Sequence, residues 1–162
     1  MTVPVVYAGS FDPVTNGHLD IIRRARSVFG EVVVLLMPNA NKRCLFSREE
    51  RLYLLKETLQ HEAGIRVDCA EGLLTDYLKK NHLKILVRGL RGPSDLAHEL
   101  TNAHYNRLFY PSAETVFLPC RAEYAFLSAS AVREAFAYGA DIRGLVPECV
   151  AHALEKKRSA PR

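Results

Sequence analysis

The chain has 162 residues, of which 48% are hydrophobic and 25% are charged, and its net charge at pH 7 is +4. These proportions are typical of a soluble globular domain with one hydrophobic core, and they exclude a disordered or fibrous protein. The basic residues are spread along the sequence, which fits a small anionic ligand better than a nucleic acid, so we expect no nucleic-acid partner.

Short apolar segments alternate along the chain with longer segments of helical periodicity. The expected strands are residues 3–8, 31–37, 66–69, 85–87 and 115–118, which are rich in Val, Ile, Leu or Phe. The expected helices are residues 17–29, 47–59, 73–80, 93–108, 128–138 and 147–157. Ser47 and Glu50 form a capping-box pattern, and Leu96, Leu100 and Leu108 give the fourth helix an apolar face.

This alternation predicts one α/β domain over residues 1–158, followed by a disordered basic tail over residues 159–162. Continuous apolar strands alternating with helices are typical of a doubly wound, Rossmann-like sheet, here five-stranded and parallel with helices on both faces. No segment is long enough for a membrane span or has the features of a signal peptide, so we expect a cytoplasmic protein without membrane contacts. The four cysteines form no CxxC pair, and free thiols are therefore expected.

The segment after the first strand has features of a phosphate-binding turn. Gly9 allows the backbone to approach a ligand, and Ser10 offers a hydroxyl group. His18 falls in the first turn of the next helix, where free N–H groups and the helix dipole suit a phosphate. The segment is neither a P-loop nor a GxGxxG motif, so by itself it fits a simple loop with a capping histidine equally well.

Basic residues follow two further strands. Lys42 follows the second strand, and Arg88 and Arg91 flank Gly89 after the fourth, on an expected strand-to-helix loop. Ligands of doubly wound sheets bind beyond the carboxyl ends of the strands, and arginine binds phosphate through two parallel hydrogen bonds. The alternatives are a solvated lysine and a structural salt bridge.

The segment after the fifth strand offers hydroxyl groups and an aromatic ring. Ser128 and Ser130 precede a helix, where they fit either an N-cap or a second phosphate site, while Tyr124 fits base stacking or core packing. The strand ends together supply donors and positive charge without an evident nucleophile–base pair or metal-ligand motif. That composition favours phosphoryl or nucleotidyl transfer.

Residues 9–13 and 15–18 resemble the (T/H)xGH signature of the nucleotidylyltransferase superfamily. With Arg-Gly-Leu-Arg at 88–91 and Ser-x-Ser-x-Val-Arg-Glu at 128–134, nearly the whole chain resembles the bacterial phosphopantetheine adenylyltransferases. The resemblance implies transfer of AMP from ATP to 4′-phosphopantetheine, giving 3′-dephospho-coenzyme A and pyrophosphate in coenzyme A biosynthesis. It also implies Mg²⁺ as cofactor, a cytoplasmic homohexamer and coenzyme A as a feedback ligand.

The resemblance also implies roles for individual residues. The implied catalytic residues are Ser10, His18, Lys42 and Arg91. The implied ATP contacts are Gly9, Ser10, Phe11, His18, Gly89, Leu90, Arg91, Glu99, Tyr124, Ala125, Phe126, Leu127, Ser128, Ala129 and Ser130. The implied phosphopantetheine contacts are Ser10, Lys42, Leu74 and Arg88, and no metal-ligating residue is implied. The chain departs from the family pattern at His98, Ala129 and the pair Leu96–Ala97, where tyrosine, a hydroxyl residue and an aromatic–acidic pair are usual.

Other functions share part of this pattern. A nucleotidylyltransferase acting on nicotinamide mononucleotide or on a sugar or polyol phosphate has the first motif, although Lys42 and Arg-Gly-Leu-Arg argue against it. A class I aminoacyl-tRNA synthetase is disfavoured because a KMSKS-like loop is missing. A non-catalytic nucleotide sensor and weak RNA binding through the basic tail are the remaining alternatives.

Overall fold

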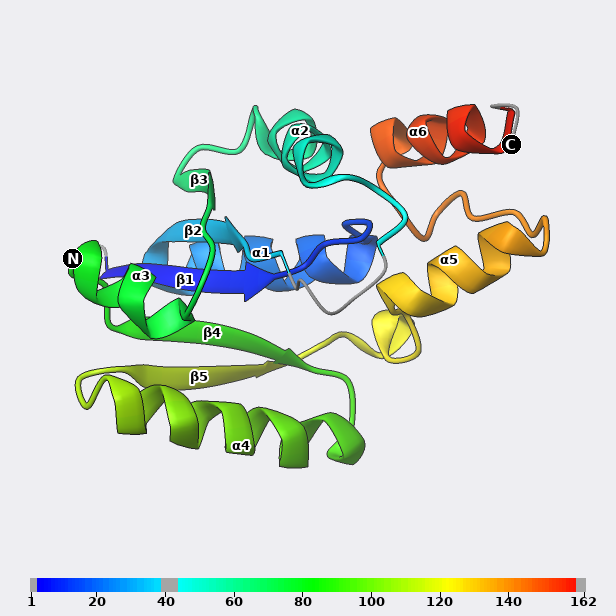
Figure 1. Ribbon diagram of the computed structural model, residues 1–162. Helices are drawn as coiled ribbons and strands as arrows, with labels where there is room; N and C mark the ends of the chain where they lie inside the picture. Colours follow the sequence, from blue (N-terminus) through cyan, green and yellow to red (C-terminus); the bar gives the residue numbers. More distant parts are fainter. Residues whose placement is uncertain (1–2, 39–43, 160–162) are drawn as a thin grey trace.

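The computed structural model describes residues 3–38 and 44–159. Its strands are β1 (Val3–Gly9), β2 (Gly30–Leu36), β3 (Ile65–Cys69), β4 (Ile85–Leu90) and β5 (Glu114–Pro119). Its α-helices are α1 (Asn16–Phe29), α2 (Arg48–Leu59), α3 (Leu74–Lys80), α4 (Pro93–Phe109), α5 (Ala129–Ala137) and α6 (Glu148–Ser159). The strands form one parallel sheet in the order β3-β2-β1-β4-β5 (Figure 1). The predicted five-stranded parallel sheet is therefore confirmed.

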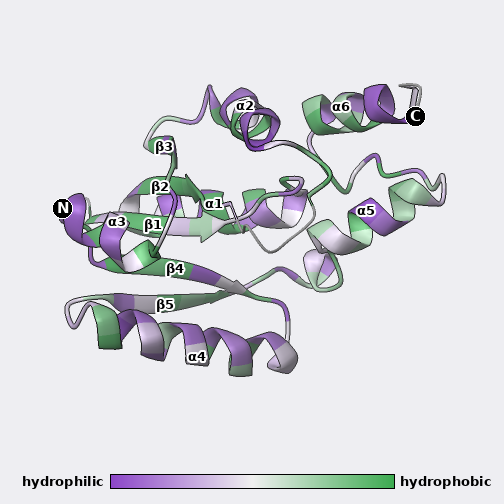
Figure 2. Ribbon diagram, viewed as in Figure 1, coloured by the Kyte–Doolittle hydropathy of each residue, from purple (hydrophilic) through white to green (hydrophobic). Residues whose placement is uncertain are grey.

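Helices cover both faces of this sheet, because successive side chains of each buried strand point in opposite directions. Val5 of β1 packs in a core with residues of α1, α2, α5 and α6. Its neighbour Val6 packs in a second core with Tyr77 and Leu78 of α3. The central strands β1 and β2 are accordingly mostly apolar (Figure 2), and the predicted doubly wound arrangement is confirmed.

The strand order places a crevice at the carboxyl ends of β1 and β4. From β1 the chain passes through α1 to β2 on one side, whereas β4 pairs with β1 on the other side. This reversal leaves the ends of the two central strands free of a crossing connection, which is where doubly wound sheets bind ligands. Helix α5 lies beyond the same end of the sheet (Figure 1).

The helix starts follow local hydrogen-bonding rules. The capping box predicted for Ser47 and Glu50 is confirmed at the start of α2, and Ser128 is the N-cap of α5, accepting from the Ala131 N–H at 3.0 Å. Helix α6 continues to Ser159, the first residue of the expected tail, whereas residues 160–162 lie outside the described part. None of the helices described here is both long and apolar enough to cross a membrane.

Strand β4 is longer than the sequence pattern indicated. It continues to Leu90, so Arg88 and Gly89 lie in the strand and not in the expected loop. The cause is pairing with β5, which extends to Leu90 opposite Pro119. Gly89 is needed there because a Cβ atom would lie 2.9 Å from Cγ1 of Ile21 on α1.

Helix α4 forms as predicted, but none of its residues is buried within the chain. Leu100 is 51% exposed and Leu108 is 61% exposed. Apolar and polar residues alternate along this helix in Figure 2. The apolar face read from the sequence therefore remains open to another molecule.

The contact between β4 and α1 gives a testable prediction. Gly89→Ala forces a methyl group against Ile21, whose β-branched side chain is stiff, and the free energy of unfolding should fall by about 1–3 kcal/mol. Gly17→Ala is the matched control, because its added Cβ meets other atoms only at 3.6 Å and alanine favours the helix. Urea denaturation measures both, and equal stability of the two variants would contradict this packing.

Candidate active site

A cavity of about 790 Å³ lies at the carboxyl ends of β1 and β4. Its walls come from the β1–α1 loop, the end of β4, the start of α4 and the segment that leads into α5. Most of the residues proposed from the sequence line it: Gly9, Ser10, Phe11, His18, Arg88, Gly89, Arg91, Glu99, Tyr124, Leu127, Ser128, Ala129 and Ser130. The structure thus brings together side chains that are up to 120 positions apart in the sequence.

Some proposed residues do not line this cavity. Leu90 and Ala125 are outside its wall, Phe126 is 96% exposed, and Leu74 packs against the core beneath α3. Lys42 lies outside the described residues. Their implied ligand contacts stay predictions.

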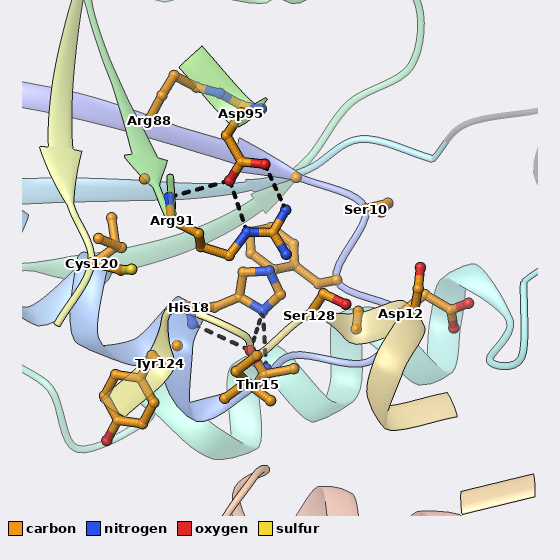
Figure 3. A pocket seen from close by; sticks show the side chains of 18 of the residues that line it. Ser10, Asp12, Thr15, His18, Arg88, Arg91, Asp95, Cys120, Tyr124 and Ser128 are labelled. Atoms are coloured by element: carbon orange, nitrogen blue, oxygen red, sulfur yellow. Dashed lines mark hydrogen bonds and ion pairs between the residues drawn. The ribbon is translucent and has the colours of Figure 1, made fainter. Parts of the chain in front are cut away.

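His18 is held by the start of α1. Thr15 is the N-cap: its hydroxyl accepts from the His18 N–H at 3.3 Å, and its own N–H donates to His18 Nδ1 at 3.0 Å. The imidazole also packs edge-on against the Phe11 ring, with 5.2 Å between ring centroids. Because Nδ1 accepts from the main chain, the ring proton is on Nε2, and the ring lies in the cavity wall (Figure 3).

The same surroundings keep His18 neutral. Burial lowers its pKa to about 4, with smaller contributions from the positive charges of Arg91 and Arg88. At neutral pH the imidazole is therefore an N–H donor and not a cation. It stands beside the amino end of α1, whose dipole favours an anion.

Arg88 is anchored by the protein itself. Its Nε and Nη2 each donate to Glu99 at 2.7 Å, and its Nη1 donates to the Ala8 carbonyl at 2.6 Å. The guanidinium has five N–H donors, so these three bonds leave others for a ligand. The structural salt bridge and the phosphate contact proposed as alternatives for this arginine are thus compatible.

Arg91 is held in a similar way at the start of α4. Its Nε and Nη2 donate to the Asp95 carboxylate at 2.8 and 3.1 Å, and its side chain remains 42% exposed. Figure 3 shows Arg91 and His18 on the same side of the cavity, with Ser128 close by. An imidazole donor, a guanidinium and an N-cap serine from three segments therefore share one wall.

Several cavity residues were missed from the sequence, among them Tyr7, Asp12, Thr15, Asp95 and Arg133. Asp12 was read only as part of a turn, yet it is 4% exposed. Its carboxylate accepts from the main-chain N–H groups of Leu45 and Phe46, each at 2.9 Å. The only sequence feature that could have indicated its role was that Asp12 is an acidic residue within the Gly9–Pro13 motif. Its hydrogen-bond partners could not be predicted because they lie 33 and 34 residues away.

Arg133 connects α5 to the first loop. It donates to the Asp12 carbonyl and to the Ser130 hydroxyl, the latter at 3.2 Å, and its guanidinium lies 3.6 Å from an Asp12 carboxylate oxygen. Arg133 is part of the Ser-x-Ser-x-Val-Arg-Glu segment noted in the sequence, but no role was predicted for it. The loop of Ser10 and the start of α5 are consequently one hydrogen-bonded unit.

Comparison with known proteins agrees with this geometry. The model of the cytidylyltransferase-like family matches residues 6–135. The phosphopantetheine adenylyltransferase of Dictyoglomus thermophilum is 48% identical over 155 residues, covering 96% of this chain and 94% of the relative. That of Thermotoga neapolitana is 49% identical over 152 residues, covering 94% of each. The chain belongs to the phosphopantetheine adenylyltransferase family. A third relative, from Syntrophotalea carbinolica, is 46% identical over 158 residues, or 97% of this chain and 95% of the relative.

The carboxylates of this adenylyltransferase-family cavity already have protein partners. Asp12 binds main-chain N–H groups, and Asp95 and Glu99 bind arginines. Within the described residues, no group of three or more His, Cys, Asp or Glu side chains is placed to hold a metal ion. The donor set of the wall therefore suits an anionic ligand.

The His18 geometry predicts an acid-dependent loss of stability. The pKa is about 4 in the folded chain against 6.5 for an unperturbed histidine, so the unfolded chain binds more protons between these values. The free energy of unfolding should then fall as the pH decreases from about 6.5 to about 4. Above pH 6.5, His18 is neutral in both the folded and the unfolded chain and should make stability no more dependent on pH.

His18→Gln is the matched variant for this measurement. Glutamine at this position can accept from the N-cap N–H, so it keeps the capping box without titrating. Urea denaturation at several pH values should give a shallower slope for the variant than for the wild type. Identical slopes would show that His18 does not hold the depressed pKa.

Proposed function

We propose that this chain transfers AMP from ATP to 4′-phosphopantetheine, giving 3′-dephospho-coenzyme A and pyrophosphate. The observation that carries the proposal is the convergence of a neutral His18 donor, the arginines and two helix amino ends in one cavity of a chain from the phosphopantetheine adenylyltransferase family. The relatives are phosphopantetheine adenylyltransferases, which identifies the acceptor, and the cavity supplies groups that suit phosphate chemistry.

The reaction needs no covalent enzyme intermediate. A phosphate oxygen of phosphopantetheine attacks the α-phosphorus of ATP, forming a new P–O–P linkage. The bond from the α-phosphorus to the bridging oxygen breaks, and pyrophosphate leaves with that electron pair. The attacking phosphate is already ionised at pH 7, so no general base is required.

The chain's own residues bind and orient the phosphates. The Nε2–H of His18, beside the positive amino end of the α1 dipole, donates to the α-phosphate oxygens, where negative charge increases in the transition state. Arg91, with the hydroxyl groups of Ser128 and Ser130, holds the leaving pyrophosphate. Tyr124, in the cavity wall, offers a ring for stacking on adenine.

The acceptor phosphate is assigned to Ser10, Lys42 and Arg88, and Leu74 to the pantetheine arm. Arg88 is held by Glu99 and by the Ala8 carbonyl, so its remaining donors are presented in a fixed direction. Substitution of Lys42 or Arg88 by alanine is accordingly proposed to raise the KM for phosphopantetheine more than the KM for ATP.

Magnesium is proposed as a partner of the triphosphate and not of the protein. The cavity carboxylates are committed to N–H donors, whereas Mg²⁺ commonly binds through substrate phosphates and waters. When bound there, it offsets negative charge on the phosphate oxygens.

The proposal is tested by incubating the purified chain with ATP, Mg²⁺ and 4′-phosphopantetheine and detecting dephospho-coenzyme A by mass. His18→Ala should lower turnover by about 10²–10³, the usual effect of losing one transition-state donor. His18→Gln should retain more turnover, because its amide can both accept from Thr15 and donate into the cavity.

Three results would each contradict part or all of this proposal. An inactive wild type with a panel of phosphate acceptors, including nicotinamide mononucleotide and sugar phosphates, would leave only nucleotide binding. Near-normal turnover of His18→Ala would remove this histidine from the mechanism. Activity with another acceptor alone would change the substrate but keep the reaction class.

We also propose a cytoplasmic homohexamer that binds coenzyme A as a feedback ligand. Coenzyme A contains the pantetheine, phosphate and adenine groups of the substrates, so it should compete for the same cavity. The open apolar side chains of α4, including Leu100 at 51% exposure, support self-association, since large exposed apolar patches commonly mark interfaces.

The α4 association is tested by size-exclusion chromatography with light scattering. The wild type should have the mass of six chains, and Leu100→Glu should shift it to smaller species because a buried charge opposes assembly. Val28→Glu, at a 67% exposed position on α1, is the control and should leave the mass unchanged. A monomeric wild type would overturn the proposed assembly.

A further inference from the structure

Tyr7 is a polar residue in the cavity wall that neither the sequence nor the proposed mechanism uses. It lies on β1, immediately before Ala8 and Gly9, which also line the cavity. Its side chain is only 7% exposed. Its ring centroid lies 5.9 Å from that of Phe11 and 6.4 Å from that of His18. The ring is thus a core side chain at the floor of the site.

The hydroxyl group of Tyr7 has no hydrogen-bond partner among the described residues. By contrast, the hydroxyl of Tyr77, another buried tyrosine, donates to Asp68 Oδ2 at 2.7 Å. Buried polar groups are normally hydrogen-bonded, because an unmet donor loses its interaction with water. Thr75 Oγ1 also has no hydrogen-bond partner, but it is completely buried. Tyr7, by contrast, lines the cavity. Its partner is therefore to be sought in the cavity.

The surroundings of this hydroxyl suit an anionic ligand. Burial raises the pKa of Tyr7 to about 12, and this outweighs the opposing effect of the Arg88 charge, so the phenol stays protonated and can donate at neutral pH. The Arg88 guanidinium is bonded to the carbonyl of Ala8, the residue next to Tyr7. The Tyr7 phenol, packed beside the His18 ring, is thus a neutral donor in the wall of the cavity where phosphates are proposed to bind.

We propose that the Tyr7 hydroxyl donates a hydrogen bond to a substrate phosphoryl oxygen in the cavity beside His18. This inference rests on the proposed adenylyl transfer and adds a contact to it. The phosphate is either the α-phosphate of ATP or the phosphate of 4′-phosphopantetheine, which meet at this point during transfer. Oxygen donors to charged phosphate oxygens form short, strong hydrogen bonds, so the contact aligns the two reacting groups.

Tyr7→Phe tests this contact because it removes one oxygen atom and keeps the ring in the core. We expect kcat/KM for dephospho-coenzyme A formation to fall about 10- to 100-fold, the usual effect of losing a hydrogen bond to a charged group. The melting temperature should be unchanged or higher, since a buried hydroxyl without a protein partner is lost. If the hydroxyl had a purely structural role, Tyr7→Phe would lower the melting temperature and leave kcat/KM unchanged.

Tyr77→Phe is the matched control. Tyr77 is 9% exposed, and burial together with its bond to Asp68 raises its pKa to about 12, but it lies outside the cavity wall. Loss of its hydroxyl should lower the melting temperature and leave kcat and both KM values unchanged. The two phenylalanine variants therefore separate a ligand contact from a structural bond.

Calorimetric titrations identify which phosphate is bound. Wild type and Tyr7→Phe are titrated separately with ATP and with 4′-phosphopantetheine; weaker binding of one ligand by the variant assigns the contact to that phosphate. Unchanged affinity for both ligands with a lower kcat assigns it to the transition state. Unchanged affinities with unchanged kcat overturn the proposal. If the wild type forms no dephospho-coenzyme A, the proposed function is wrong. The Tyr7 contact is then tested by the two titrations alone, and equal affinities of wild type and variant for both ligands contradict it.

Discussion

The hydrogen bond from the Thr15 N–H to His18 Nδ1 is the interaction on which this site depends. It completes the capping box that starts α1, and it fixes the imidazole as the tautomer with its proton on Nε2. The same bond therefore stabilises the helix and orients the Nε2–H donor of His18 toward the cavity. Protonation at Nδ1 would break this bond. Burial and the charges of Arg91 and Arg88 lower the pKa of His18, so the ring remains a neutral donor beside the helix dipole.

Positive charge in the cavity is held in place before any ligand arrives. Arg88 is bound by Glu99, Arg91 by Asp95, and Arg133 lies against Asp12. Each carboxylate offsets the desolvation of its arginine and restricts the side chain to one direction. A triphosphate then meets guanidinium groups that need little rearrangement, and such preorganisation is the main way in which a protein assists phosphoryl-type transfer. The carboxylates thus act on the reaction through the arginines they position.

The sequence was sufficient for features determined by neighbouring residues. Apolar runs located the strands, and the turn at Gly17 placed His18 in the first turn of a helix. It was insufficient where partners are distant in the chain. Arg88 and Gly89 look like a loop, but pairing with β5 draws them into β4. Asp12 looks like a turn residue, but its partners are Leu45, Phe46 and Arg133. Helix α4 has an apolar face that the rest of the described chain does not bury, so its periodicity alone could not say what it packs against.

The position of β1 explains why polar chemistry is concentrated at its carboxyl end. As the central strand it has neighbours on both edges and helices on both faces, so its side chains reach a cavity only where the sheet ends. There, Tyr7 points to the α1 face, and Ala8, whose small side chain belongs to the opposite core, accepts from Arg88 through its carbonyl. Donors at the edge of two apolar cores are weakly screened by water, and their attraction for phosphate oxygens is correspondingly stronger. The hydrophobic packing that makes β1 the centre of the fold is consequently also what strengthens the polar contacts at its end.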